Sequence, residues 1–373
     1  MRIGIPTETH FEEKRVGLTP SAVDVLVKSG HKVFVQSGAG LESHFTDENY
    51  RDSGADIVYD VEEVYHRAEM LAKIAPLSEA EADLLQPGQT LFSFLHLAIT
   101  KKNIVQLLLD KKITAIGYEL IEHNGEYPVQ QAMSEIAGPV SIQVAERFLG
   151  SDNPESRGVL LGGLTGVAPA AVVIIGAGVA GYHAAKAALG RGAQVIILDI
   201  DQRKLRKVKS DCGDRVTTVL ANPYTIARGA KFADVLIGAV QVKAEKSPHI
   251  ITEDTVASMK KGAVIVDLSI DQGGCVETSR PTTLSQPVFV EHGVLHYCVP
   301  NMPALVSRTA SYGLTNAAIP YIFKIAEEGL ANAIMGDSGL ANGVCTYNGF
   351  CSNTTIADSL NIEYRRLHLF PTN

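Results

Sequence analysis

Residues 172–199 read VVIIGAGVAGYHAAKAALGRGAQVIILD and join a strand pattern, a glycine-rich turn, a helix pattern and a second strand. Gly176, Gly178 and Gly181 have the G-x-G-x-x-G spacing. The first glycine permits a tight turn, the second lets the backbone approach a pyrophosphate, and the third lets the helix pack close to the strand. The helix N-terminus then points at the phosphates. This order predicts a dinucleotide-binding βαβ unit, with an ordinary crossover without ligand as the alternative.

Asp199 closes the second strand, about twenty residues after the glycines, where an acid can bind the adenosine ribose. A carboxylate at this position accepts hydrogen bonds from both ribose hydroxyls and repels a 2′-phosphate. We therefore expect NAD rather than NADP as the cofactor.

The composition is that of a soluble globular protein with room for two domains: 373 residues, of which 46% are hydrophobic and 20% charged. The formal net charge of -8 disfavours nucleic acid and anionic membrane surfaces as partners. Five scattered cysteines without a C-x-x-C pair are typical of reduced cytoplasmic thiols, and the N-terminal MRIGIP begins as a strand rather than a signal peptide. Residues 158–181 contain no charged residue, but their glycines and Pro169 argue against a transmembrane helix.

Short apolar strands alternate with helices over residues 1–120, which predicts a parallel, doubly wound sheet. Residues 131–149 indicate a long helix with Pro139 near a kink, and residues 309–335 indicate another. We expect an α/β chain of two doubly wound parallel-sheet domains joined by long helices. The expected bounds are 1–130 with 309–373 for a discontinuous substrate and catalytic domain, and 131–308 for a Rossmann NAD-binding domain.

Ionisable residues at the ends of apolar runs are the candidates for chemistry, since ligands of open α/β sheets lie at the carboxyl ends of strands. Arg15, in EEKRVGLTP, could bind a carboxylate in bidentate fashion or lie solvated in a charged loop. Lys73 interrupts the apolar EMLAKIAP, which is costly unless the side chain emerges into a polar cleft. His96 closes TLFSFLHLA and could exchange protons near neutral pH, or be a core histidine bonded to a backbone carbonyl.

The segment AVIVDLSIDQGG offers two carboxylates. Asp271 lies just past the strand, with Gly273 and Gly274 behind it, which suits a loop carboxylate that faces a ligand. Asp267 lies within the run and is expected to be structural.

His292, His296 and Cys298 suggest a metal site at first sight. However, HGVLHYCV has the pattern of a turn and a strand, in which positions four apart are separated by about 13 Å. Such residues do not close on one ion, so no metal site is predicted.

Several long strings in this sequence resemble the alanine dehydrogenases, in the family that also includes the NAD-binding part of proton-translocating transhydrogenases. The resemblance covers about residues 1–335. It is carried by KRVGLTP, LHLA around His96, MSEIAG at 133–138, GAGVAG at 176–181, VDLSIDQGGCVETSRPTT at 266–283 and HYCVPNMPALVSRTASYGLTN at 296–316.

The resemblance implies roles for the residues at matching positions. Arg15 and Lys73 would hold the substrate carboxylate and carbonyl oxygen, His96 would be the general acid and base, and Asp271 would assist proton transfer. The residues implied to contact the cofactor are Ser134, Gly176, Gly178, Val179, Gly181, Asp199, Lys204, Val240, Asn301 and Met302.

Three segments depart from the family pattern. Thr165 stands where a proline is usual before the glycine turn, VKAEKSPHI after Val240 lacks the usual small residues, and AKIAPLSEAE lacks the usual Lys-Glu-Pro after its lysine. Residues 340–373 match poorly. These departures bear mainly on substrate selectivity.

By resemblance we expect an NAD-dependent oxidoreductase of amino-acid catabolism that converts L-alanine reversibly to pyruvate and ammonium. It would be a cytoplasmic homo-hexamer without a metal, membrane or nucleic-acid partner. The NAD-binding subunit of a transhydrogenase and a non-catalytic NAD(H)-binding sensor are the alternatives. An opine- or saccharopine-type dehydrogenase is a further enzyme alternative, which needs a larger pocket.

Overall fold

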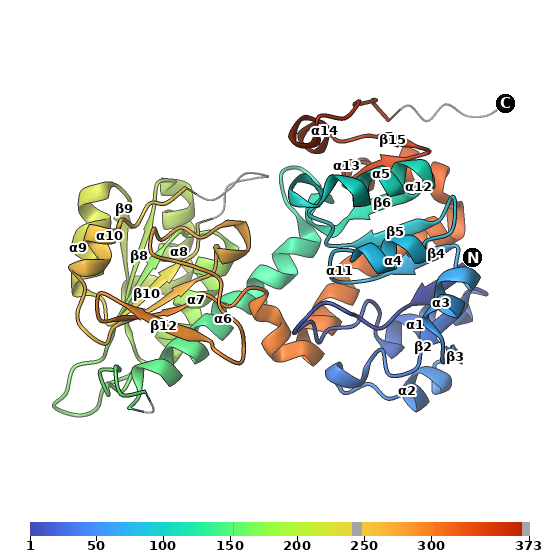
Figure 1. Cartoon of the computed structure of the whole chain (residues 1–373). Coiled ribbons are helices and arrows are strands. Elements are labelled where there is room, and N and C mark those ends of the chain that lie inside the picture. The colour runs from blue at the N-terminus through green and yellow to red at the C-terminus, as the bar shows by residue number, and fades with distance from the viewer. Residues whose placement is uncertain (152, 241–247, 368–373) are drawn as a thin grey trace. The chain divides into compact units, whose positions relative to one another are not determined.

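The computed structural model describes residues 1–151, 153–240 and 248–367. The chain forms two compact units, Met1–Met133 with Ala304–Asn373, and Ser134–Pro303 (Figure 1). The first unit is discontinuous, because the chain leaves it, builds the second unit and then returns. The units divide the chain at 133/134 and 303/304, against the expected 130/131 and 308/309.

The first unit contains an eight-stranded sheet in the order β15-β14-β6-β5-β4-β1-β2-β3. Its strands are β1 (Arg2–Ile5), β2 (Lys32–Gln36), β3 (Asp56–Val58), β4 (Met70–Ala72), β5 (Thr90–Ser93), β6 (Thr114–Gly117), β14 (Val344–Tyr347) and β15 (Phe350–Cys351). Strands β1 to β6 pair in parallel, and β14 and β15 add an antiparallel edge beyond β6. The parallel strands thus have the order 3-2-1-4-5-6 of a Rossmann fold.

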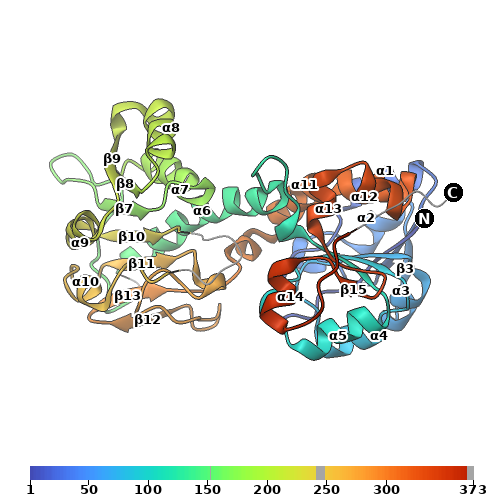
Figure 2. The same ribbon diagram turned by 90° about the horizontal axis from the view of Figure 1, so that it is seen from above.

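Helices flank this sheet (Figure 2). They are α1 (Pro20–Lys28), α2 (Asp47–Asp52), α3 (Val61–Arg67), α4 (Glu79–Leu84), α5 (Lys102–Asp110), α11 (Ser307–Glu328), α12 (Leu330–Met335), α13 (Ser338–Gly343) and α14 (Thr354–Leu360). Short 3₁₀ turns are η1 (Leu41–Ser43), η2 (Leu97–Ile99) and η3 (Tyr118–Leu120), and η6 (Met302–Val306) crosses the unit boundary. A capping box of Ser78 and Glu81 starts α4, since each side chain accepts the other residue's backbone N–H.

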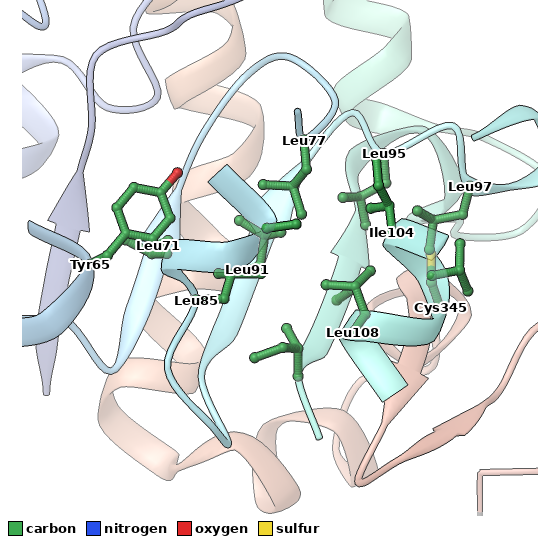
Figure 3. Close-up of a cluster of buried hydrophobic side chains, with 14 of the residues drawn as sticks. Tyr65, Leu71, Leu77, Leu85, Leu91, Leu95, Leu97, Ile104, Leu108 and Cys345 are labelled. Atoms are coloured by element: carbon green, nitrogen blue, oxygen red, sulfur yellow. The ribbon is translucent and has the colours of Figure 1, made fainter. Parts of the chain in front are cut away.

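A large hydrophobic core packs one face of this sheet (Figure 3). Leu71 of β4 and Leu91 of β5 lie in the same buried cluster as Leu108 of α5. Cys345 of β14 and Ile356 of α14 complete it from the C-terminal stretch. Each buried leucine or isoleucine stabilises the fold by about 1.5–3 kcal/mol. The segment with the weakest sequence pattern is therefore part of the core.

The second unit contains a seven-stranded sheet in the order β12-β13-β11-β10-β7-β8-β9. Its strands are β7 (Ala171–Ile175), β8 (Gln194–Asp199), β9 (Val216–Leu220), β10 (Val235–Gly238), β11 (Val264–Asp267), β12 (Val288–Glu291) and β13 (Val294–Tyr297). Its helices and 3₁₀ turns are α7 (Val179–Gly190), α8 (Gln202–Cys212), η4 (Gly213–Arg215), α9 (Pro223–Phe232), α10 (Glu253–Ala257) and η5 (Ile270–Gln272). All neighbours are parallel except β12 and β13. The predicted α/β class with two mostly parallel sheets is confirmed.

The two long helices differ from their expected bounds. Helix α6 (Pro128–Leu149) begins three residues earlier than residue 131, and Pro139 lies inside it. The single helix expected over 309–335 is wrong, because Gly329 has φ +78° and divides α11 from α12. This left-handed backbone favours glycine and ends a helix. Within the described residues, no helix is both long and apolar enough to span a membrane.

Candidate active site

Each sheet has one point at which its parallel strand order reverses. In the first unit this point lies between β1 and β4, and in the second unit it lies between β7 and β10. Ligands of open α/β sheets bind outside the carboxyl ends of the strands at such a point. Arg15 and Lys73 follow β1 and β4, while the glycine turn and Val240 follow β7 and β10.

The glycine turn after β7 has the geometry that a dinucleotide requires. Gly176 has φ +104°, and a Cβ there would collide with the backbone carbonyl of Ala239. A Cβ on Gly181 would collide with the carbonyl of Gly176, so only glycine lets α7 approach the turn this closely. Gly178 is the N-cap of α7, and no atom lies within 4 Å of where its Cβ would be. The backbone at Gly178 and Val179 is thus accessible to a pyrophosphate at the start of a 12-residue helix.

Asp199 lies at the end of β8 and supports the same turn. Its Oδ2 accepts the backbone N–H of Ala177 at 2.7 Å, and its Oδ1 accepts that of Asp201 at 2.7 Å. Each carboxylate oxygen has a second lone pair, so Asp199 can also accept ribose hydroxyls. Lys204 is exposed on the neighbouring helix α8. These residues fit a dinucleotide.

Asp267 holds the turn that presents Asp271. Its Oδ1 accepts the backbone N–H of Ser269 at 3.0 Å, and its Oδ2 accepts that of Cys275 at 3.0 Å. Asp267 is buried and structural, as its place in the strand predicted. Asp271 is exposed in η5, and its Oδ1 accepts the backbone N–H of Asn301 at 3.1 Å. The structure therefore brings the predicted residues Asp271 and Asn301 together.

The remaining cofactor candidates lie on different elements of the second unit. Ser134 is partly buried in α6, and Met302 is buried at the start of η6. The carbonyl of Val240 accepts the Ser269 hydroxyl at 2.6 Å, which ties the end of β10 to the turn below Asp271. Residues 241–247, which include most of the VKAEKSPHI segment, lie outside the described residues.

Arg15 is buried and ion-paired rather than solvated. Its side chain is 6% exposed and that of Glu13 is 2% exposed. Arg15 Nε and Nη2 donate to the two Glu13 carboxylate oxygens at 2.8 and 2.6 Å. Arg15 Nη1 donates to the Met133 sulfur at 3.2 Å, and the guanidinium lies 5.8 Å from the Phe94 ring centroid. The solvated alternative for Arg15 is therefore wrong.

Lys73 does not emerge into a polar cleft, so that expectation is wrong. Its side chain is fully buried, and its Nζ donates to Glu8 Oε2 at 3.0 Å and Glu81 Oε1 at 2.7 Å. Burial opposes the charge on Lys73, but the two carboxylates outweigh it and raise the pKa of the ammonium. Burial raises the pKa of Glu8. Burial also opposes ionisation of Glu81, but the interactions with Lys73 and Ser78 outweigh it and lower the pKa of Glu81. The strand tolerates this lysine because two acids surround it.

His96 lies just after β5 and is accessible. Its side chain is 44% exposed, which rules out a core histidine. It has φ +46°, a conformation that costs a non-glycine residue energy. The Glu119 carboxylate accepts the backbone N–H groups of Leu95 and His96 at 3.2 and 2.7 Å, and the ring stacks on Phe94 with 6.3 Å between centroids. This geometry presents an accessible imidazole just after β5.

The residues considered for a metal have other partners. Both ring nitrogens of His296 are hydrogen-bonded, to the Thr278 hydroxyl at 2.8 Å and the Val294 carbonyl at 3.0 Å. His292 pairs with Glu253 at 2.8 Å. Over the described ranges, no cluster of three histidine, cysteine or acidic residues could hold a metal ion.

Two sequence models of one family match almost the whole chain. The alanine dehydrogenase/PNT N-terminal domain matches residues 4–137, and the C-terminal domain of the same family matches residues 141–354. This chain belongs to the alanine dehydrogenase/PNT family. Membership implies a nicotinamide cofactor, which the glycine turn fits.

Relatives in the alanine dehydrogenase/PNT family are similar over nearly their full length. Alanine dehydrogenases of Methanococcus maripaludis and Mycobacterium tuberculosis are each 43% identical to this chain, over 98% of both partners. Among solved structures, an L-alanine dehydrogenase has a TM-score of 0.93 at 41% identity. The match covers 97% of this chain and 99% of that one. A transhydrogenase from Sinorhizobium meliloti has a TM-score of 0.82 at 21% identity, over 94% of this chain and 100% of that one, and shares the fold.

Several charged residues around the candidate site were not identified from the sequence. They are the acids that hold the predicted cations and His96, namely Glu8, Glu13, Glu81 and Glu119. A signal existed for Glu81, since Ser78–Glu81 has the S-x-x-E capping-box spacing. Glu8 and Glu119 lie 65 and 23 residues from the groups they hold, and no local pattern marks them.

Proposed function

We propose that the protein is an NAD-dependent L-alanine dehydrogenase. The reaction converts L-alanine, water and NAD reversibly to pyruvate, ammonium, NADH and a proton. The observation that carries the proposal is Arg15, a buried guanidinium at the strand-order reversal of one sheet, in a chain whose other sheet carries the dinucleotide turn. The alanine dehydrogenases among its relatives, at 43% identity, support the same reaction.

Cofactor binding is assigned to the second unit. The backbone at Gly178 and Val179 binds the pyrophosphate, and Asp199 with Lys204 binds the adenosine ribose. Asp199 favours NAD over NADP because its carboxylate repels a 2′-phosphate. Ser134, Val240, Asn301 and Met302 border the rest of the cofactor, as the resemblance implies. A bound nicotinamide would supply a hydride acceptor for the substrate α-carbon, and loss of the hydride would convert the substrate to an imine.

Substrate positioning and proton transfer are assigned to Arg15, His96 and Asp271. Arg15 binds the carboxylate of L-alanine or pyruvate through charge-assisted hydrogen bonds. His96 accepts a proton as water adds to the imine and returns one as ammonia leaves, with Asp271 assisting. Arg15 and His96 belong to the first unit and Asp271 to the second.

Lys73 enters the proposal with a narrower role than the resemblance implies. Its ammonium already donates to Glu8 and Glu81 inside a fully buried triad. The Glu8 carboxylate also accepts the backbone N–H groups of Ile74 and Ala75 at 2.7 and 3.1 Å. We therefore assign Lys73 to positioning the chain after β4, and the substrate carbonyl oxygen to His96.

The cellular setting follows the family resemblance. We propose a cytoplasmic homo-hexamer that acts in amino-acid catabolism. Five buried, unpaired cysteines support a reducing compartment, because they form no disulfide. The mass of the purified protein in solution tests the hexamer.

The test is NADH consumption followed by its absorbance, with pyruvate, ammonium or both. Loss of absorbance only when both are present supports reductive amination of pyruvate. Loss with pyruvate alone indicates a 2-hydroxy-acid dehydrogenase instead. NADH binding without consumption under any of these conditions overturns the proposal in favour of a transhydrogenase subunit or a sensor.

A further inference from the structure

The Glu13–Arg15 pair uses only one edge of the guanidinium. Nε and Nη2 face the Glu13 carboxylate in a bidentate pair, and Glu13 Oε1 also accepts the Arg15 backbone N–H at 3.0 Å. The pair is local, two residues apart, and both side chains are buried. Bidentate pairing fixes the orientation of a guanidinium as well as its position.

The other edge, formed by Nη1 and Nη2, is poorly satisfied. Among the described residues, the acceptor at this edge is the Met133 sulfur, 3.2 Å from Nη1. A thioether is a weak acceptor, and a buried donor without a good partner is costly. This edge therefore suits the carboxylate of a ligand.

The segment that carries the pair is held rigidly within the first unit. The backbone N–H groups of Val16 and Thr19 donate to the Ser311 and Thr315 hydroxyls on α11, at 3.1 and 3.2 Å. Gly17 lies so close to the Ala72 carbonyl at the end of β4 that no Cβ would fit. The direction in which Arg15 presents its second edge is thus set by Glu13 and not by loop movement.

Buried charges near Arg15 leave no surplus of positive charge. Glu13 contributes to the raised pKa of Glu8, so the pair and the Lys73 triad lie within electrostatic range of each other. Together they comprise the cations Arg15 and Lys73 and the carboxylates Glu8, Glu13 and Glu81. A second carboxylate on a ligand would find no counter-ion here.

We infer that Glu13 is a positioning and specificity-determining residue, which aims the second edge of Arg15 at a single carboxylate and excludes dicarboxylic oxo acids. This inference rests on the proposed function and narrows its substrates to small monocarboxylic oxo and amino acids. Arg15 touches the substrate, while Glu13 acts through Arg15.

The test compares pyruvate with 2-oxomalonate, in which a carboxylate replaces the methyl group. Glu13→Gln keeps the length of the side chain and removes its charge. It should raise the KM for pyruvate about tenfold with a smaller change in kcat, and reduce the preference for pyruvate about tenfold. Glu13→Asp keeps the charge but shortens the reach, so the KM rises while the preference is retained. The KM for NADH is the internal control.

Two results would overturn the inference. One is a folded Glu13→Gln variant whose pyruvate KM and preference stay within about twofold of the parent. The other, if Glu13→Gln does not fold, is a Glu13→Asp variant with the parent's KM. If the parent itself does not consume NADH, the proposed function fails separately. Calorimetric titration of pyruvate into the parent, Glu13→Gln and Arg15→Met proteins then still decides the inference, since both variants should bind it more weakly.

Discussion

The two sheets share one strand order and use the same point of it in opposite ways. After β1 and β4 the first unit gathers charged side chains, with Arg15 paired to Glu13 and Lys73 held between Glu8 and Glu81. After β7 the second unit has glycines in place of residues with side chains, and these glycines leave the backbone exposed. One sheet would recognise a small anion with a guanidinium, and the other a pyrophosphate with backbone N–H groups.

The comparison teaches that the same topology does not dictate the same means of recognition. A pyrophosphate is large and needs close backbone approach, which glycine permits. A single small carboxylate needs a directed cation, and a buried cation needs compensating acids. The first solution needs glycines, which lose more backbone freedom on folding than other residues. The second needs buried acids, which lie close in sequence for Arg15 and Glu13 and 65 residues apart for Lys73 and Glu8.

The largest expected effect comes from the groups that would move protons, one on each unit. His96→Ala and Asp271→Asn should each reduce kcat by about 10²–10⁴-fold, the range for loss of a general acid or base. NADH affinity should stay within a few-fold, since neither side chain holds the glycine turn. Steady-state rates and NADH titrations measure both quantities. Turnover near that of the parent in both variants would contradict the assignment.

Lys73→Met tests the buried triad that Lys73 forms with Glu8 and Glu81 in the first unit. Removal of the ammonium leaves Glu8 and Glu81 buried without a counter-ion, which should cost about 3–5 kcal/mol in the free energy of unfolding near neutral pH. Urea unfolding measures this cost. Lys101→Met is the matched control, because Lys101 is exposed and pairs with Glu79 on the surface. Exposed ion pairs contribute little to stability, so the control should unfold at nearly the same urea concentration as the parent.

The cost of Lys73→Met should depend on pH. In the parent, the raised pKa of Lys73 means that its stabilisation is present below its ordinary value of 10.5 and is lost as the pH rises through the folded value. The lowered pKa of Glu81 means that its contribution is present above 4.5 and is lost as the pH falls. In the variant, protonation of the two acids relieves their repulsion, so the difference from the parent should shrink on acidification. A constant difference between pH 4 and 8, roughly the window of these acids, would contradict the triad.

Gly181→Ala and Gly178→Ala separate two roles of the glycine turn in the second unit, which are helix packing and cofactor binding. A methyl group at Gly181 would meet the Gly176 carbonyl, so the variant should lose about 1–3 kcal/mol of stability. A methyl at Gly178 meets no atom within 4 Å, so stability should change by less than about 0.5 kcal/mol. Gly178→Ala should instead weaken NADH binding about tenfold, because it occupies the approach of the pyrophosphate. Equal NADH affinity in the parent and Gly178→Ala would contradict this use of the backbone.

Asp199→Asn is expected to have the smallest effect and concerns the acid that the second unit would direct at the adenosine ribose. The amide no longer repels a 2′-phosphate, so the preference for NAD over NADP in kcat/KM should fall about tenfold. Assays with both cofactors measure the ratio. An unchanged ratio would mean that another group recognises the ribose.

Local patterns predicted the second unit better than the first. The glycine spacing and Asp199 lie within one βαβ unit, so sequence distance and spatial distance agree. Arg15 was found because it follows the first strand and its loop, Lys73 because it interrupts an apolar strand, and His96 because it ends an apolar run. Their acidic partners were not predicted, and Glu8 lies 65 residues from Lys73. The short strands β14 and β15 were missed because their sequences, VCTY and FC, form no apolar run like those of the predicted strands. The break at Gly329 was readable as a helix end, and the continuous apolar pattern on both sides obscured it.

The return of the chain to its first unit has a consequence for biosynthesis. The second unit is continuous, so a growing polypeptide contains all of it once Pro303 has left the ribosome. At that moment the core of the first unit still lacks Cys345, Cys351, Ile356 and Ala357, and β6 has no partner on its outer side. Domains generally fold as units during synthesis, in the order in which they are completed. The nucleotide half of this protein is thus the first to be finished, and the half that begins the chain waits for its last strands.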